Sequence, residues 1–123
     1  GYKVGVTNNL RSRQHTYNDD LSKYTENNFE YLGYINTTYL KSFIMEEALK
    51  KVFEDVNNKS HGLDFGGKSE IFLLDKNHLD FMNEIFSGEH LDYLEEHEDK
   101  IINAKSEHFK GLVNYLKSKI ERK

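Results

Sequence analysis

The sequence contains no cysteine and no long apolar run. Without cysteine the chain can form no disulfide, carries no thiol nucleophile and offers no zinc–thiolate site. Its apolar runs stay well below the ~18 residues that a membrane-spanning helix needs, so no membrane partner is expected. No charged and then apolar leader opens the sequence, and the lack of cysteine fits a reducing compartment. An intracellular location is therefore expected, without a choice between cytoplasm and nucleus.

The net charge and the distribution of charge lead to different expectations about binding to DNA. The 123 residues, enough for one domain, carry a net charge of -4, which alone argues against a DNA-binding protein. Residues 1–18, however, hold three basic residues and no acid, whereas residues 84–99 hold seven acids and no lysine or arginine. Residues 100–123 have seven lysines and arginines against two acids. This pattern predicts a phosphate-facing patch at the N-terminal end, with the acidic stretch facing away. The alternative for residues 84–123 is ordinary solvated faces.

The pattern of apolar residues predicts an alternation of strands and helices. Strands are predicted where aromatic, aliphatic and β-branched residues gather, at residues 2–6, 29–35 and 70–74. Helices are predicted from caps and helical spacing, at residues 8–18, 40–57 and 76–86 and over most of 89–123. Asp75 is the expected cap of the third helix, and Ser87-Gly88 its end. The expected fold is α+β, with a small three-stranded sheet flanked by helices and a helical C-terminal extension.

Three features suit the cutting of a phosphodiester bond, which requires an activated water and neutralisation of the charge that develops on the phosphate. Lys3 and Arg13 lie about ten residues apart on a predicted strand–turn–helix, so both cations could face one phosphate at the helix start. Glu46 lies beside the apolar stripe of the second helix, where partial desolvation favours binding of a cation. Glu70 directly precedes the last strand. Each has a structural alternative: Arg13 on a helix surface, Glu46 paired with Lys50, and Glu70 as an edge-strand charge.

Read together, these features resemble the GIY-YIG nuclease superfamily, in the branch typical of phages and large DNA viruses. Residues 5–13 (GVTNNLRSR) resemble the stretch after the second half of the motif, and Lys3-Val4-Gly5 stands where the founding motif has Tyr-Ile-Gly. Residues 45–53 resemble the helix that bears the metal-binding glutamate, here Glu46, with lysine where many relatives have histidine four residues later. Residues 70–74 resemble the closing Glu-aromatic-Phe strand.

The resemblance implies a DNA endonuclease that uses one Mg²⁺ or Mn²⁺ ion. It implies catalytic roles for Lys3, Arg13 and Glu46, with Glu46 as the metal ligand. Further residues are candidates for contact with the substrate: Arg11, His15 and Tyr17. Tyr2 and Tyr17 are candidates for a substitute hydroxyl, with packing as the alternative. The nuclease-like domain is expected to span residues 1–75, and residues 76–123 to form the helical extension.

The first strand of the family, which bears Gly-Ile-Tyr, is expected some ten or more residues before Lys3. Its absence from the sequence leaves three interpretations open: a fragment, a strand supplied by another segment or chain, or a degenerate domain. The alternative function is therefore a catalytically incomplete module that binds nucleic acid or a protein. The apolar stripe over residues 101–120 could also pair two copies into a homodimer.

Overall fold

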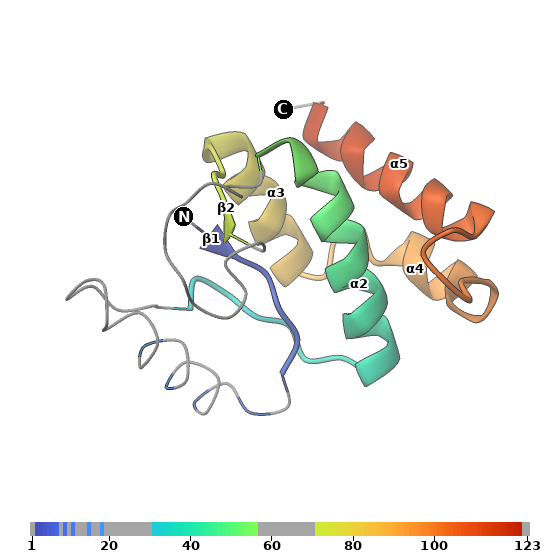
Figure 1. Cartoon of the computed structure of the whole chain (residues 1–123), viewed down its shortest axis with the longest axis horizontal. Coiled ribbons are helices and arrows are strands. Elements are labelled where there is room, and N and C mark those ends of the chain that lie inside the picture. The colour runs from blue at the N-terminus through green and yellow to red at the C-terminus, as the bar shows by residue number, and fades with distance from the viewer. Residues whose placement is uncertain are drawn as a thin grey trace.

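Four α-helices account for most of the part of the chain that the structure describes (Figure 1). A computed structural model of the chain describes residues 2–7, 9, 11, 15, 18, 31–56 and 71–121. The helices are α2 (Tyr39–Val52), α3 (Lys76–Phe86), α4 (Asp92–His97) and α5 (Glu107–Glu121). Two short 3₁₀ turns follow α2 and α4, at Glu54–Val56 and Glu98–Lys100. None of the helices in these ranges is long and apolar enough to cross a membrane.

Local capping explains where α3 begins and ends. Asp75 accepts a hydrogen bond from the backbone N–H of His78 at 3.0 Å, and the His78 ring accepts one from the Asp75 N–H at 3.1 Å, which completes a capping box. At the other end, the N–H groups of Gly88 and Glu89 bond the carbonyls of Ile85 and Glu84 in a Schellman pattern. Gly88 has a φ of 92°, which glycine adopts without a steric penalty. The predicted helix 76–86 and its break are confirmed.

The predicted α+β fold with a three-stranded sheet is wrong. Extended pairing among the described residues is limited to β1 (Tyr2–Lys3) and β2 (Ile71–Phe72), which are antiparallel, with Tyr2 opposite Phe72. Residues 31–35, the described part of the predicted second strand, belong to no strand. The described part of the chain is a helical structure with one minimal strand pair.

The reason lies in where apolar side chains are buried. A sheet is stable when an apolar face covers a core, but here helices supply nearly all of the core. Of the two strand side chains that the structure describes, Tyr2 is half-buried and Phe72 is buried. In the expected second strand, Leu32 is 67% exposed and Tyr34 58% exposed. Gly33 instead lies against the ring of Phe86, so closely that a Cβ at Gly33 would overlap that ring.

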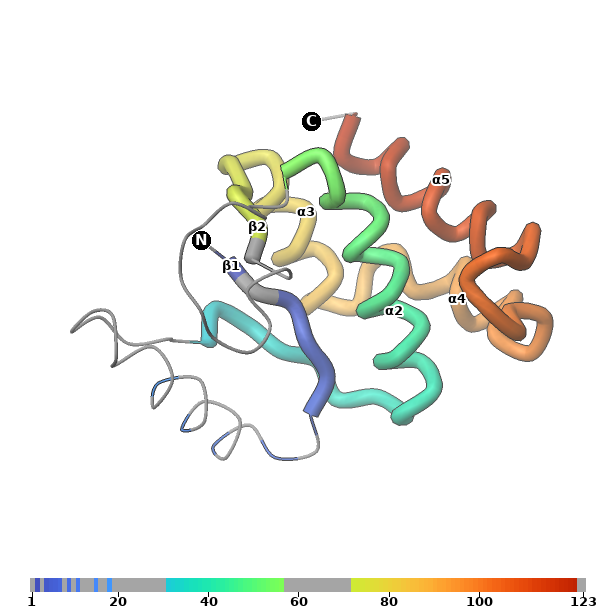
Figure 2. The backbone as a smooth tube through the Cα atoms, in the orientation of Figure 1, coloured from blue at the N-terminus to red at the C-terminus, as the bar shows by residue number. Residues whose placement is uncertain are grey.

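One hydrophobic core joins the two predicted units, residues 1–75 and 76–123. Helix α5 contacts α2, α3 and α4, and Figure 2 shows it beside α2 and α4. The largest fully buried side chains among the described residues come from both units: Phe53, Phe72, Phe81, Ile85, Leu112 and Leu116. Much of the apolar stripe predicted to pair two copies is buried in this same core: Ile101, Phe109, Leu112, Val113 and Leu116. The division at residue 75 and the homodimer both stay predictions.

Candidate metal and nucleic-acid site on helix α2

Glu46 lies on α2 where the buried side of the helix meets its outer side. Its neighbours Met45 and Ala48 are buried, at 7% and 0% exposure, whereas its own carboxylate side chain is 16% exposed. Residues three and four apart share a helix face, so Phe43 and Lys50 lie on the same face as Glu46. The carboxylate is therefore partly desolvated but open on one side, as the helical pattern predicted.

The alternative pairing of Glu46 is present in the structure. Lys50 Nζ lies 3.1 Å from Glu46 Oε1 and 3.5 Å from Glu47 Oε1. One ammonium thus serves two carboxylates, and the three groups together carry a charge of -1. A divalent cation that entered between the two carboxylates would raise this to +1.

The donor set fits a hard, hydrated cation. Mg²⁺ is usually held by one or two carboxylates and keeps several water ligands, and Glu46 with Glu47 supplies that number. Within the described ranges, no group of three or more histidine, aspartate or glutamate side chains is arranged to hold a metal ion. A closed protein cage is therefore not what these residues form, and a metal here would keep open positions for substrate.

The other predicted catalytic residues are only partly placed. Lys3 belongs to β1, and its backbone pairs with Ile71, the residue after Glu70. Val4, next to it, packs against the core that contains α2. The Lys3 side chain and the whole of Arg13, Tyr17 and Glu70 lie outside the described residues. The predicted convergence of Arg13 with Glu46 is thus not tested.

Three other N-terminal candidates have side chains that the structure describes. Arg11 and His15 have helical backbone and exposed side chains, while Tyr2 is half-buried. Most of the predicted helix 8–18, to which Arg11 and His15 belong, lies outside the described ranges. Exposure is compatible with contact to a nucleic acid, and the roles of Arg11 and His15 stay predictions.

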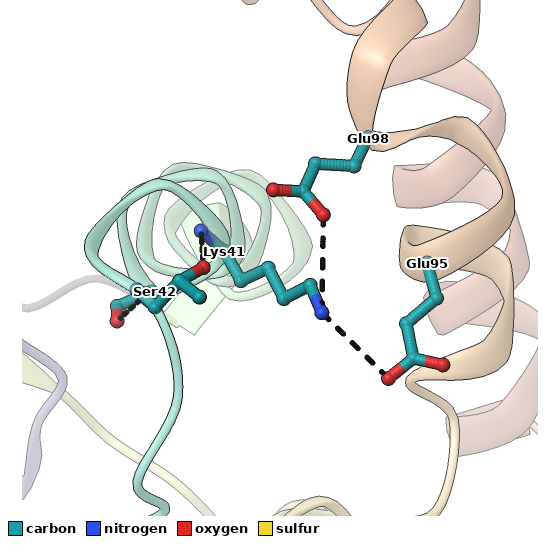
Figure 3. Close-up of polar contacts among 5 residues, drawn as sticks. Lys41, Ser42, Glu95 and Glu98 are labelled. Carbon is teal, nitrogen blue, oxygen red and sulfur yellow. Dashed lines mark hydrogen bonds and ion pairs between the residues drawn. The ribbon is translucent and has the colours of Figure 1, made fainter.

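Two acids of the stretch 84–99 contact α2 at Lys41. Figure 3 shows Lys41 extending between Glu95 of α4 and Glu98 in the turn that follows. Lys41 Nζ lies 3.9 Å from a carboxylate oxygen of each. Lys41 is two residues from both Tyr39 and Phe43, and residues two apart point to different sides of a helix. The acids are therefore partly neutralised by α2 and lie away from its aromatic side.

An exposed aromatic pair on α2 was not identified from the sequence. Tyr39 is 76% exposed and Phe43 46% exposed, and their rings are near-parallel, with centroids 6.4 Å apart and planes at 19°. The spacing of four residues, which places two rings on one helix face just before Glu46, was the available signal. The apolar spacing in this helix predicts its buried stripe and does not predict which rings stay exposed.

Comparisons of the chain with protein-family models, with curated proteins and with solved structures found no match.

Proposed function

We propose that the chain is a metal-dependent endonuclease domain of GIY-YIG type that hydrolyses DNA phosphodiester bonds. The observation that carries this proposal is the position of Glu46: a carboxylate 16% exposed at the edge of the core, with a second carboxylate one residue away. Glu46 and the more exposed Glu47 share the ammonium of Lys50 and keep a net negative charge, which favours a divalent cation.

Each proposed catalytic residue has one task. Glu46 holds the cation, with Glu47 beside it. Arg13 neutralises charge on the scissile phosphate through its guanidinium, which donates two parallel hydrogen bonds to phosphate oxygens. Lys3 lies on the strand next to the core and assists in phosphate binding and water activation. When bound, a Mg²⁺ or Mn²⁺ ion would supply Lewis-acid stabilisation of the phosphate oxygens.

DNA is the proposed partner, held by the basic N-terminal segment. Arg11 and His15 have exposed side chains that could reach the phosphate backbone, and Tyr17 is the third proposed contact. Contacts of this kind supply affinity without reading base sequence, and the affinity falls as salt rises. We therefore propose no sequence preference.

Glu46→Gln tests the proposal because it keeps the size and hydrogen-bonding capacity of the side chain but removes its charge. We expect loss of Mg²⁺-dependent cleavage of a labelled DNA by at least about 100-fold, the order that a lost transition-state charge contact costs. Glu107→Gln is the matched control, because it removes the charge of an 87% exposed carboxylate that is paired with Lys110 on α5, and it should retain full activity. Equal cleavage by wild type and Glu46→Gln would refute the assignment. Arg13→Ala should also abolish cleavage, and circular dichroism of each variant checks that the fold is kept.

A binding module without catalysis is the second candidate, and the ion pair between Lys50 and Glu46 favours it, because that pair satisfies the carboxylate without a metal. The two candidates differ in Mn²⁺ binding. Electron paramagnetic resonance of added Mn²⁺ should show an ion that Glu46→Gln no longer binds if the domain is catalytic. Salt-sensitive DNA binding with no Mn²⁺ site would instead select the binding module.

A further inference from the structure

Two histidine rings meet where α4 ends and α5 begins. His97 is the last residue of α4, His108 is the second residue of α5, and their ring centroids lie 5.4 Å apart. Both side chains are half-buried. The two residues are eleven positions apart in the sequence, and the contact between α4 and α5 brings them together.

The hydrogen bond of the His97 ring determines which of its nitrogens can bind a metal ion. Nδ1 lies 2.9 Å from the backbone carbonyl oxygen of Tyr93. Because a carbonyl oxygen only accepts, Nδ1 carries the proton, and Nε2 of the neutral ring keeps its lone pair. Histidines that bind metals commonly have this arrangement, in which one ring nitrogen donates to a carbonyl or carboxylate and the other contacts the metal.

Aromatic side chains hold the His97 ring in place. It stacks on Tyr93, with centroids 4.2 Å apart and planes at 19°. Tyr93 in turn stacks on Tyr115 of α5, and its hydroxyl lies against Gly111, where a Cβ would overlap it. The orientation of His97 is therefore set in advance, and a metal ion would order this side chain at little entropic cost.

The separation of the two rings suits a shared ion. A metal lies ~2.0–2.1 Å from an imidazole nitrogen and so about 3.2 Å from the ring centre, which places two rings in tetrahedral geometry about 5 Å apart. The observed separation is 5.4 Å, with the planes at 33°. In the part of the chain that the structure describes, no hydrogen bond fixes the His108 ring. Its broad terminal torsion therefore allows it to turn a nitrogen toward the ion.

We propose that His97 and His108 together bind one divalent transition-metal ion such as Zn²⁺, which links the end of α4 to the start of α5. Imidazole nitrogen suits Zn²⁺, Cu²⁺ and Ni²⁺, whereas Mg²⁺ and Ca²⁺ take oxygen ligands. Water fills the positions that the two rings leave open. The site is separate from the carboxylates of Glu46 and Glu47 and does not depend on the proposed nuclease function.

The charge around the histidine pair favours a cation. Two neutral imidazoles contribute no charge of their own, so the attraction comes from their neighbours. Lys41 partly neutralises Glu95 and Glu98, at 3.9 Å from a carboxylate oxygen of each. The negative field of the remaining acids raises the local concentration of cations. Residues 92–99 contain five acids and no lysine or arginine: Asp92, Glu95, Glu96, Glu98 and Asp99.

Calorimetric titration of the full chain with Zn²⁺ tests the proposal, with excess Mg²⁺ present to compete for carboxylate sites. Wild type should bind one ion per chain. His97→Phe and His108→Phe each keep a flat ring for packing but remove the nitrogens. Each should weaken Zn²⁺ binding at least about 10-fold, because loss of a ligand costs no less than loss of the group that orients it. Urea denaturation without metal checks that each variant folds.

The histidine ring nitrogens give a second readout, by nuclear magnetic resonance of the wild-type chain. Zn²⁺ should shift the Nε2 resonance of His97 while Nδ1 stays protonated, together with one ring nitrogen of His108. Glu46→Gln is the matched control for the carboxylate site on α2. It should bind Zn²⁺ as wild type does, whether or not the wild-type protein cuts DNA.

No Zn²⁺ binding by wild type, or equal affinity of wild type and both phenylalanine variants, would overturn the proposal. Resonance shifts confined to other histidines would do the same. One ion bound per two chains would also contradict it, since the site would then lie between copies. Loss of Zn²⁺ binding in Glu46→Gln would place the ion on α2 instead of on the histidine pair.

Discussion

His90 adopts a backbone conformation that is unusual for its residue type. Its φ is 67°, in the left-handed region that non-glycine residues rarely adopt. The ring is held on three sides: Nε2 donates to Glu84 Oε2 at 2.7 Å, the ring stacks on Phe81 with centroids 5.6 Å apart, and its edge meets Tyr115. A single side chain thus joins the end of α3 to α5. These contacts offset a backbone cost of about 1–2 kcal/mol.

Substitutions at His90 should separate the backbone cost from the ring contacts. His90→Ala keeps the strained backbone and loses all three contacts, so we expect it to lower the free energy of unfolding by about 2 kcal/mol. His90→Gly also loses the contacts but removes the strain, and should be about 1 kcal/mol more stable than His90→Ala. Urea denaturation of both variants measures the difference. If the alanine and glycine variants were equally stable, φ at this residue would carry no cost.

At the scale of an element, the start of α3 depends on an N-terminal cap, Asp75, that the sequence predicts. Asp75 accepts a bond from the N–H of His78, and the His78 ring returns one to the Asp75 N–H. Asp75→Ala should therefore lower the free energy of unfolding by about 1 kcal/mol, measured by thermal or urea denaturation. Asp75→Asn keeps an accepting side-chain oxygen and should cost less than half of that. A neutral effect of alanine would mean that α3 is held by packing alone.

Helices and strands differed in how well the sequence predicted them. The helix over 76–86 was predicted to the residue because its cap, its apolar spacing and its glycine end are all local. The strand over 29–35 was predicted from aromatic and aliphatic content alone. Strand formation depends on a partner that covers the same face, and no local pattern states whether one exists. Leu32 and Tyr34 are exposed, and Gly33 lies against Phe86 instead.

The candidate site was predictable to the same extent as the helix that carries it. Helical spacing placed Glu46 at the edge of the buried stripe, and it gave Lys50 as the alternative partner, which the structure contains. The relation between Glu46 and Arg13 depends on how two segments more than thirty residues apart are arranged. Spacing cannot give that relation, so it has to come from activity and metal binding of variants.

For the whole molecule, the shared core decides whether the predicted units 1–75 and 76–123 act independently. Phe53 and Phe72 from the first unit have ring centroids 5.9 Å apart, and Phe53 also meets the ring of Phe81 from the second at 6.3 Å. Leu112 and Leu116 of α5 are fully buried in the same cluster. Lys41 adds an ion pair between α2 and the α4 region. Core contacts that cross residue 75 favour one cooperative unit.

A change in α5 should therefore destabilise α2 as much as α5 itself. Leu116→Ala leaves a cavity in the core, and we expect it to lower the free energy of unfolding by about 3 kcal/mol. In a single cooperative unit the slowest-exchanging amides of α2 and α5 open together, so hydrogen exchange in both helices should accelerate by the same factor, of the order of 100-fold. Ile102→Ala, at an 81% exposed position, is the control and should change neither. Acceleration confined to α5 would show that residues 76–123 unfold on their own, as the predicted division at residue 75 requires.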